Sequence, residues 1–174
     1  MPKRVKIALV GAEAAGKTTL AQALAAKYQG TFIPEAARDY LPALQRDYNR
    51  LDIDNILRLQ LQYEQKSSES QLLFCDTEAL VCKIWAEYKF GQASPFIEQV
   101  WELQPYDFYL LCENLEEWQP DPLREAPDLS TRQQLHFLYK SYLEQYQRPF
   151  AIVTGNPEER IKQAAAALKV RFGI

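Results

Sequence analysis

The chain has 174 residues, of which 47% are hydrophobic and 25% are charged, and its formal net charge is −3. These values are typical of a single soluble globular domain over residues 1–174, with enough apolar residues to form a core. The 20 basic residues are scattered along the chain, which argues against a surface that binds nucleic acid and against a patch that binds anionic membranes.

Short apolar segments alternate with helical segments along the sequence. We predict strands at residues 4–10, 31–35, 72–76, 107–113 and 149–155. The spacing of apolar residues between them predicts helices at residues 17–28, 36–46, 53–70, 78–90, 95–104, 130–147 and 157–171. Strands that alternate with helices form a parallel sheet covered on both faces, so we expect an α/β fold, a three-layer αβα sandwich with five parallel strands. Ligands of such sheets bind at the carboxyl ends of the strands.

The first predicted strand is followed by a glycine-framed loop. The segment GAEAAGKTTL at residues 11–20 fits the pattern G-x-x-x-x-G-K-[ST] of P-loop NTPases, and a helical stretch continues from it. Strand, glycine loop and helix together point backbone N–H groups and a helix N-terminus at an anion. We expect Lys17 to reach the β- and γ-phosphates of ATP and the Thr18 hydroxyl to bind Mg²⁺. The expected ATP-binding residues of this loop are Gly11, Ala12, Glu13, Ala14, Ala15, Gly16, Lys17, Thr18 and Thr19.

Lys3 and Arg4 precede the apolar residues of the first strand, as basic residues precede the apolar region of a signal peptide. The apolar run is too short for such a region, which has about 7–15 residues, and it leads directly into the phosphate loop. No run elsewhere approaches the roughly 18 apolar residues that cross a bilayer. We therefore expect a cytoplasmic protein that does not bind membranes.

Carboxylates follow the second and third strands. Glu35 and Arg38, in EAARDY, are three residues apart and would share one helix face. Glu35 can accept a proton from an acceptor hydroxyl while Arg38 binds oxyanions; an ordinary exposed ion pair is the alternative. Asp76 follows four apolar residues, a pattern typical of an aspartate that holds Mg²⁺ beside Thr18, with a helix N-cap as its other possible role. Glu35 is the first candidate for the catalytic base and Asp76 the second.

Residues 114–132 form a long, charged and proline-rich segment between the fourth strand and the next helix. Loops of more than about 12–15 residues in compact domains are often lids or binding loops. Arg124 and Arg132 lie near its end, and phosphoryl transfer needs cations over the migrating group. We expect a lid that brings these two arginines to the reaction; a solvated loop with surface arginines is the alternative.

The cysteines are three in number, without a C-x-x-C pair. This argues against a disulfide framework and against a zinc site, and it favours buried small side chains. The cysteines are Cys75, Cys82 and Cys112. The single histidine, His136, lies in a predicted helix away from every motif, so we assign it no catalytic role.

Phosphate loops also occur in switch GTPases and in ATPases that transport or unfold other molecules. The chain lacks the Asn/Thr-Lys-x-Asp element with which a GTPase reads its base, and ATPases of the second kind are usually larger or oligomeric. The Glu35–Arg38 pair and the predicted lid favour transfer of phosphate to a bound acceptor. A nucleotide-binding regulatory module without catalysis remains the alternative from another class, since a fold does not fix a function.

Several motifs together resemble one family. The phosphate loop, EAARDYL, FCDTE, YKFGQASPF, YDFYLLCENLEEW and DPLR are similar, in this order, to the ribosylnicotinamide kinase domain of NadR-type NAD-biosynthesis proteins, and GNPEER resembles that family's final loop and helix. The resemblance implies a fold related to nucleoside kinases and ATP-dependent phosphorylation of the 5′-hydroxyl of nicotinamide riboside, which gives nicotinamide mononucleotide. Another nucleoside kinase or a nucleoside-monophosphate kinase is the alternative within this class.

The resemblance also implies roles for individual residues. The phosphate loop takes the triphosphate, Glu35 and Arg38 match the acceptor motif, and the aspartate after the third strand matches a metal or base position. Arg124 matches the lid arginine of the family. Gly155 and Asn156 match the loop beside adenine.

Two features depart from the family. NadR proteins carry a DNA-binding segment and a nucleotidyltransferase domain before the kinase, whereas this sequence begins at the kinase region, so we expect neither a repressor nor an adenylyltransferase role. Pro34 stands where the family has an aromatic residue before the acceptor glutamate. An aromatic ring there could stack on nicotinamide, so Pro34 leaves the identity of the acceptor open.

The expected acceptor is a nucleoside rather than a nucleoside monophosphate. A monophosphate brings two negative charges that several arginines would pair, yet between the second and fourth strands only Arg38 lies at a strand exit. Nicotinamide riboside is a cation with a flat ring, which suits carboxylates and aromatic faces. We therefore add Asp39 to the expected acceptor contacts, with Tyr63 and Trp118 as stacking partners. The sequence does not indicate an oligomeric state.

Overall fold

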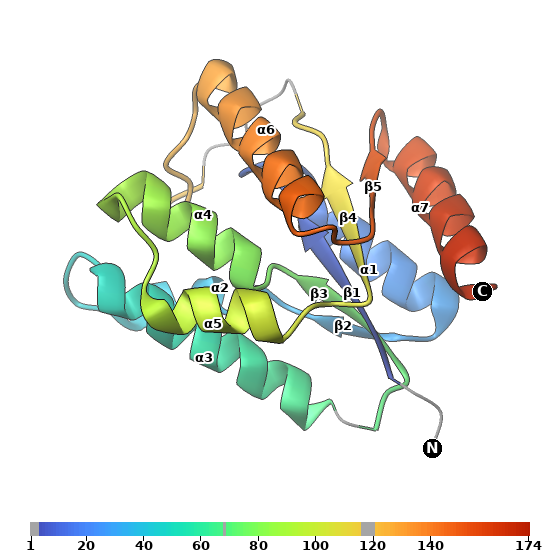
Figure 1. Ribbon diagram of the computed structural model, residues 1–174, viewed down its shortest axis with the longest axis horizontal. Helices are drawn as coiled ribbons and strands as arrows, with labels where there is room; N and C mark the ends of the chain where they lie inside the picture. Colours follow the sequence, from blue (N-terminus) through green and yellow to red (C-terminus); the bar gives the residue numbers. More distant parts are fainter. Residues whose placement is uncertain (1–3, 68, 116–120) are drawn as a thin grey trace.

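The computed structural model describes residues 4–67, 69–115 and 121–174. Its strands are β1 (Val5–Val10), β2 (Thr31–Ile33), β3 (Leu72–Asp76), β4 (Phe108–Cys112) and β5 (Phe150–Val153). They form one parallel sheet in the order β2-β3-β1-β4-β5 (Figure 1). The predicted sheet of five parallel strands is confirmed, and the phosphate loop leaves its central strand.

Helices cover both faces of this sheet. They are α1 (Lys17–Tyr28), α2 (Ala37–Tyr40), α3 (Arg50–Lys66), α4 (Ala79–Phe90), α5 (Pro95–Leu103), α6 (Leu129–Gln145) and α7 (Pro157–Phe172). Helices α1 and α7 pack on one face, whereas α3, α4, α5 and α6 pack on the other (Figure 1). The predicted three-layer αβα sandwich is therefore confirmed.

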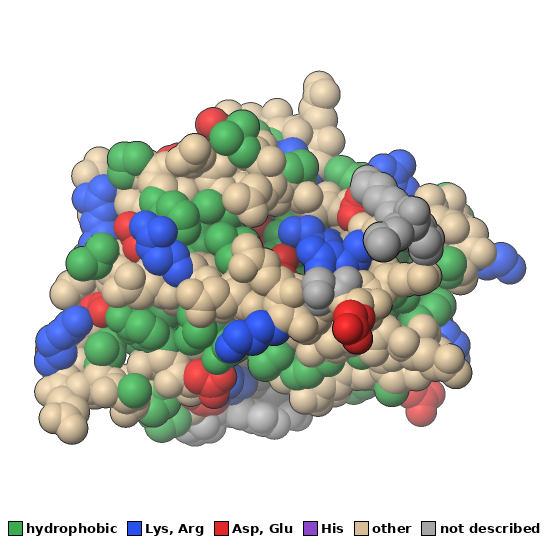
Figure 2. Space-filling model, turned by 90° about the horizontal axis from the view of Figure 1, so that it is seen from below, with side chains coloured by type: hydrophobic (Ala, Val, Ile, Leu, Met, Phe, Trp, Pro, Cys, Tyr) green, Lys and Arg blue, Asp and Glu red, His purple; other side chains and the backbone are tan. Residues whose placement is uncertain are grey.

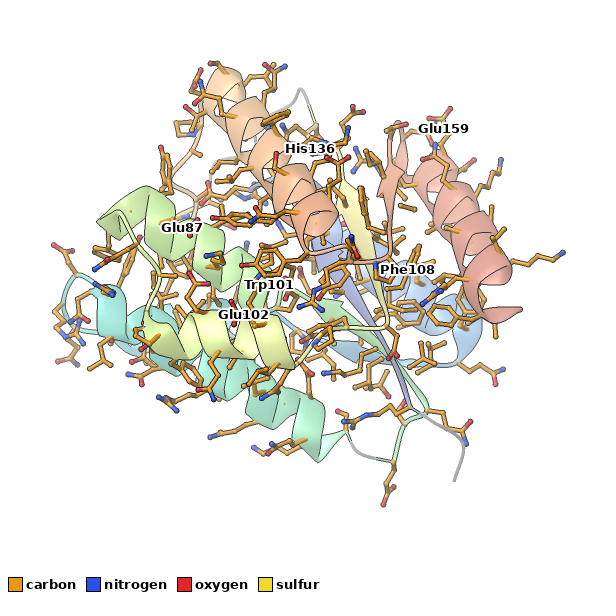
Figure 3. The ribbon with its side chains drawn as sticks, in the orientation of Figure 1. Glu87, Trp101, Glu102, Phe108, His136 and Glu159 are labelled. Carbon is orange, nitrogen blue, oxygen red and sulfur yellow. The ribbon has the colours of Figure 1, made fainter. Side chains whose placement is uncertain are left out.

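Two apolar cores hold the three layers together. Successive strand residues point to opposite faces of a sheet, so Ile7 and Leu9 of β1 pack toward α1 and α7, whereas Ala8 and Val10 pack toward the other helices. All four are fully buried. Among the described residues, Trp101 of α5 is the largest fully buried side chain, and it lies in the second core (Figure 3). The strand that leads into the phosphate loop is thus fixed from both sides.

The single helix predicted at residues 36–46 is wrong. Helix α2 ends at Tyr40, a 3₁₀ turn follows at Leu41–Ala43, and the chain is extended at Leu44. Pro42 explains the break, because proline has no N–H with which to continue an α-helix and its ring collides with the preceding turn.

Helix α3 begins three residues before its predicted start at residue 53. The Asn49 side chain accepts the N–H of Leu51 at 2.9 Å, and the Asp52 carboxylate accepts the N–H of Asn49 at 2.7 Å. This capping box supplies partners for N–H groups that a helix N-terminus leaves without one. The helix ends at Lys66 rather than at residue 70. Apart from α3 and the segment 36–46, every predicted helix and strand starts and ends within two residues of its predicted bounds.

The surface and the cysteines agree with the composition. All three cysteines are buried and unpaired, as predicted, and burial raises the pKa of Cys112 to about 11. On the face shown in Figure 2, Lys and Arg side chains form several separate groups among acidic and apolar ones. Within the described residues, no helix has the length and apolar character needed to cross a membrane.

Glu78 starts helix α4 and is almost completely buried. Its Oε1 accepts the N–H of Leu80 at 2.8 Å, while Oε2 has no hydrogen-bond partner among the described residues. The N-cap role considered for Asp76 therefore belongs to Glu78. Burial raises the pKa of Glu78 to about 8.

This raised pKa predicts a loss of stability as the pH rises. The folded chain keeps a proton on Glu78 up to about pH 8, whereas the unfolded chain releases it near 4.5. The contribution of Glu78 to the free energy of unfolding is complete at a pH below the pKa of Glu78 in the unfolded chain. It is lost as the pH rises toward the pKa of Glu78 in the folded chain. In Glu78→Gln, which cannot ionise, the free energy of unfolding should exceed that of the parent by an amount that grows by up to about 1.4 kcal/mol per pH unit across this window. Urea denaturation over the window measures it, and a difference that does not change with pH would contradict it.

Candidate functional site

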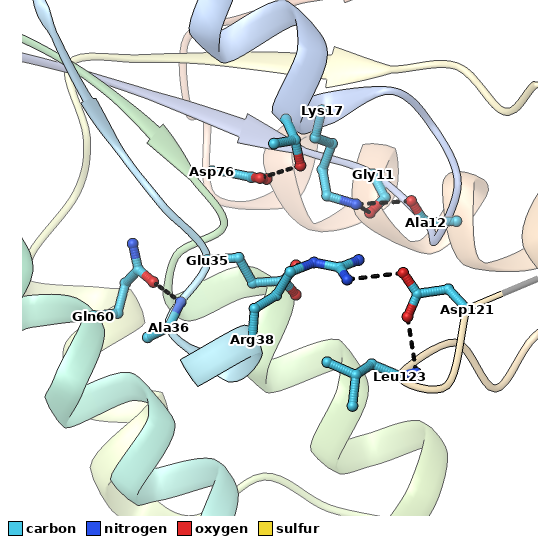
Figure 4. Close-up of polar contacts among 11 residues, drawn as sticks. Gly11, Ala12, Lys17, Glu35, Ala36, Arg38, Gln60, Asp76, Asp121 and Leu123 are labelled. Atoms are coloured by element: carbon cyan, nitrogen blue, oxygen red, sulfur yellow. Dashed lines mark hydrogen bonds and ion pairs between the residues drawn. The ribbon is translucent and has the colours of Figure 1, made fainter. Parts of the chain in front are cut away.

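The phosphate loop packs closely against the neighbouring strand. Gly11 and Gly16 have φ angles of 138° and 75°, which favour glycine. A Cβ on Gly11 would lie 2.7 Å from the carbonyl oxygen of Cys112 in β4, so no side chain fits there. The Nζ of Lys17 lies over the loop and donates to the carbonyls of Gly11 and Ala12 at 3.0 and 2.8 Å (Figure 4).

Asp76, the last residue of β3, lies beside the first turn of α1. The Thr18 hydroxyl donates to Asp76 Oδ2 (Figure 4), while the buried Oδ1 has no hydrogen-bond partner among the described residues. Burial raises the pKa of Asp76, and Lys17 and the Thr18 hydrogen bond lower it. A carboxylate oxygen without a partner next to a hydroxyl fits Mg²⁺, which prefers oxygen ligands. The structure thus brings together the two side chains of the predicted metal site.

Glu35 follows β2 and lies near the lysine of the phosphate loop. Gln60 of α3 fixes this segment, because its side-chain oxygen accepts the backbone N–H of the residue after Glu35 at 2.9 Å (Figure 4). Arg38 Nε lies 3.3 Å from Glu35 Oε2, so the two side chains pair. The predicted shared helix face is wrong, because α2 begins at Ala37 and Glu35 precedes it. Burial raises the pKa of Glu35, and the charge of Lys17 lowers it while that of Asp76 raises it. The electrostatic coupling of the three groups indicates that they share one site.

A cavity of about 310 Å³, within the size range of small-molecule sites, is lined by Lys17, Thr18 and Glu35. Asp76 does not line it and reaches it only through its hydrogen bond with Thr18. The phosphate loop contributes residues 11–19, and the segment after β2 contributes Glu35 and Arg38. Helices α4 and α6 supply an apolar and aromatic lining made of Val81, Ile84, Trp85, Tyr88, Leu135 and Tyr139. The α4 members have the spacing i, i+3, i+4, i+7 of one helix face, a pattern in the sequence that could have identified this lining.

The described part of the predicted lid lies at the same cavity. Leu123 and Arg124 line it, so Arg124 is placed as expected. Asp121 accepts from Arg38 at 2.8 Å and from the N–H of Leu123 at 2.9 Å (Figure 4). Helix α6 begins at Leu129, so the last four positions of the predicted lid belong to a helix.

Arg132 does not line the cavity and is not a lid arginine. It belongs to α6, is 1% exposed, and donates to the carbonyl of Leu115 at 2.8 Å. Its position indicates that it supports the chain after β4 instead of covering a phosphate. His136, on the same helix (Figure 3), does not line the cavity either.

Asp39 and Tyr63, two further expected acceptor contacts, are not at the cavity. The Tyr63 hydroxyl donates to Asp39 Oδ2 at 2.7 Å, and neither residue lines the cavity. Trp118 lies outside the described residues. The aromatic lining of the site therefore comes from α4 and α6 and not from Tyr63.

Gly155 and Asn156, expected beside adenine, follow β5 and do not line this cavity. The Asn156 side chain accepts the N–H of Glu159 at 3.0 Å and caps α7 (Figure 3 labels Glu159). An adenine contact from these two residues stays a prediction.

Arg160, which no motif indicated, joins the segment after β5 to the phosphate loop. Its buried guanidinium donates to the carbonyls of Gly155, Ala15 and Glu113 at 2.7, 2.7 and 2.9 Å. In a trans peptide the carbonyl and the next N–H point to opposite sides, so the bond to Ala15 directs the following N–H of the loop away from Arg160. The sequence did offer one signal for this role. Arg160 lies near the N-terminus of α7, where the helix dipole disfavours a cation, so its placement there calls for another reason.

Comparison with known proteins places this site in a family. The sequence model of a family described as "AAA domain" matches residues 6–160, which is most of the chain. The chain belongs to this AAA domain family. Its phosphate loop, Thr18–Asp76 pair and Glu35 all lie within the matched residues.

Two curated relatives are "Trifunctional NAD biosynthesis/regulator protein NadR" proteins. The protein of Escherichia coli strain K12 is 26% identical over 147 residues, which covers 80% of this chain and 35% of the relative. The protein of Salmonella typhimurium strain LT2 is 27% identical over 129 residues, which covers 68% of this chain and 30% of the relative. The chain thus spans about a third of the length of these relatives.

Solved structures share the fold. A crystal structure of NadR protein in complex with NR has a TM-score of 0.78 and 21% identity, covering 98% of this chain and 52% of that one. NadR protein in complex with NAD and AMP-PNP has a TM-score of 0.72, 21% identity and coverages of 98% and 50%. Deoxyadenosine kinase from M. mycoides has a TM-score of 0.67 and 14% identity, covering 95% of this chain and 100% of that one. The comparisons confirm the resemblance to NadR-type proteins and the P-loop fold shared with nucleoside kinases.

The Thr18–Asp76 geometry predicts that Mg²⁺ strengthens nucleotide binding through Asp76. In Asp76→Asn the amide oxygen can still accept from Thr18, but the charge that attracts the cation is gone. We expect Mg²⁺ to raise the affinity of the parent for AMP-PNP and to have less than about a tenth of this effect in the variant. Calorimetric titrations with and without Mg²⁺ measure both affinities. An equal effect of Mg²⁺ in the two proteins would contradict the predicted metal site.

Proposed function

We propose that the chain is an ATP-dependent kinase that phosphorylates the 5′-hydroxyl of a nucleoside, with nicotinamide riboside as the acceptor. The placement of Glu35 carries this proposal. Its carboxylate interacts with Lys17 of the phosphate loop and with Arg38, and all three line one cavity. A hydroxyl bound at Glu35 would therefore lie close to the phosphate held by Lys17, as in-line transfer requires.

The donor side would bind ATP with the backbone N–H groups of the phosphate loop and Lys17. Thr18 and Asp76 would hold Mg²⁺, which when bound neutralises charge on the β- and γ-phosphates. The likeness to a NadR structure that contains AMP-PNP supports ATP as the donor. Arg124 of the lid would add a cation over the migrating group.

The hydrogen bonds of the two carboxylates favour different roles. Asp76 accepts from Thr18 on the donor side, whereas Glu35 pairs with Arg38 on the segment after β2. We therefore assign the proton-accepting role to Glu35 and the metal role to Asp76. The pKa is raised for both carboxylates, so the assignment rests on their hydrogen-bond and ion-pair partners alone.

The cavity suits an uncharged or cationic acceptor better than a phosphorylated one. Among the described residues its cations are Lys17, Arg38 and Arg124, and Arg38 already pairs with Glu35 and Asp121. An acceptor phosphate would have to compete for Arg38, whereas a cationic pyridinium ring can lie against an aromatic side chain. Trp85 and Tyr139 offer such faces.

The departure at Pro34 lies outside the lining of the cavity. Pro34 is exposed and does not line it, while α4 and α6 supply aromatic rings to the lining. The NadR relatives and the NadR structure in complex with NR favour nicotinamide riboside. The likeness to deoxyadenosine kinase makes a deoxynucleoside the second candidate.

A panel of acceptors tests the proposal. Nicotinamide riboside, deoxyadenosine, uridine, thymidine and their 5′-monophosphates are compared by ADP formation, with the product identified by mass. We expect nicotinamide riboside to have the highest kcat/KM, and Lys17→Ala to lose at least about a hundredfold in kcat because a transition-state cation is removed. A monophosphate that exceeds the riboside by tenfold, about 1.4 kcal/mol of transition-state preference, contradicts the acceptor. ATP binding without turnover of any acceptor favours a regulatory module.

The raised pKa of Glu35 predicts the pH dependence of the reaction. A base is active only when deprotonated, so kcat/KM should rise with pH through the folded pKa, which lies above the ordinary value of 4.5. Glu35→Gln should lower kcat by about a hundredfold or more, and it should remove the rise of kcat/KM with pH on the acidic side of the profile (the acidic limb). Asp39→Asn, a matched change four residues further along the chain on α2 and outside the cavity, should preserve both. An acidic limb retained in Glu35→Gln would show that another group is the base.

A further inference from the structure

Glu13 places a carboxylate inside a loop built to bind phosphate. It lines the same cavity as Lys17, and a negative charge there repels a polyphosphate. The structure gives this carboxylate partners on the lid. Glu13 Oε2 accepts the backbone N–H groups of Glu125 and Ala126, both at 2.8 Å. Residues more than a hundred positions apart along the chain are thus joined through one oxygen atom.

The side chain of Glu125 extends this connection to the aromatic lining. Its carboxylate binds Lys89 Nζ at 2.8 Å and accepts the Tyr48 hydroxyl at 2.8 Å. The Tyr48 oxygen in turn accepts the indole N–H of Trp85 at 3.0 Å, and Trp85 lines the cavity. The lid residue held by Glu13 therefore also contacts the network behind the expected acceptor.

We propose that Glu13 is a positioning residue that ties the lid to the phosphate loop and so holds Arg124 at the cavity. Arg124 immediately precedes the two amides that Glu13 accepts. The other end of the same segment is anchored by the ion pair of Asp121 with Arg38 at 2.8 Å. A segment fixed at both ends has little freedom, so the arginine between them is already ordered before the reaction. The effect on catalysis rests on the proposed kinase function, whereas the tie itself does not.

Loss of the tie should change kcat and the KM for ATP differently. With a loose lid, Arg124 contributes less to the transition state, so kcat falls. ATP binding is not weakened, because the substitution removes a negative charge from the phosphate-binding loop. We expect kcat of Glu13→Ala to fall about tenfold or more with the KM for ATP unchanged or lower. A residue that only shaped the loop would raise the KM for ATP, so a raised KM with an unchanged kcat overturns the proposal.

Amide hydrogen exchange of Glu125 and Ala126, measured by NMR without substrates, tests the tie directly. In Glu13→Ala both amides should exchange about tenfold faster, the loss expected for one hydrogen bond to a charged acceptor. Glu13→Gln keeps an acceptor oxygen and should lie between Glu13→Ala and the parent. Glu102→Gln, which removes the same charge from an exposed site on α5 (Figure 3), should leave both amides unchanged.

Unchanged exchange at both amides in the two Glu13 variants overturns the proposal whatever the kinetics. If the parent phosphorylates no nucleoside, the proposed function fails, and the exchange rates alone still decide whether Glu13 holds the lid. The two failures are therefore distinguishable.

Discussion

The register between β1 and its two neighbours is the constraint on which the whole site depends. Leu9 of β1 lies opposite Asp76 of β3, and Val10 lies opposite Leu111 of β4. Because these strands are parallel, their carboxyl ends meet at one edge of the sheet. The phosphate loop leaves β1 at that edge, where the next residue passes too close to β4 to carry a side chain. A shift of one residue would turn Asp76 to the other face of the sheet and separate it from Thr18.

Two carboxylates share this edge with one lysine. Burial raises the pKa of both Glu35 and Asp76, and Lys17 lowers both. Asp76 is almost completely buried and its Oδ1 has no hydrogen-bond partner among the described residues, so its charge is costly there, whereas Glu35 is partly buried and pairs with Arg38. A bound cation beside Asp76 and a proton moving to Glu35 would each relieve part of this cost. The arrangement therefore suits a site that binds a metal–nucleotide and accepts a proton from a second substrate.

Features that depend on short-range patterns were predictable from the sequence. The strand, loop and helix over residues 5–28 and the aspartate at Asp76 follow from apolar runs and a fixed motif, and they are where the sequence indicated. Packing between distant segments was not predictable. Tyr63 of α3 donates to Asp39 of α2, and Arg160 of α7 donates to the phosphate loop; each contact depends on how separate helices pack. The lining of the cavity was predictable in type, since one face of α4 is apolar and aromatic, but not in its position next to the phosphate loop.

A crystal structure of the chain with nicotinamide riboside, AMP-PNP and Mg²⁺ would test most directly whether Glu35 acts on the acceptor. The 5′-oxygen should lie about 2.6–3.2 Å from the Glu35 carboxylate, in line with the γ-phosphate, with the ring of the base against Trp85 or Tyr139. A riboside bound outside this cavity, or with its 5′-hydroxyl at Asp76 instead of Glu35, would contradict the separation of the two carboxylates into an acceptor side and a metal side.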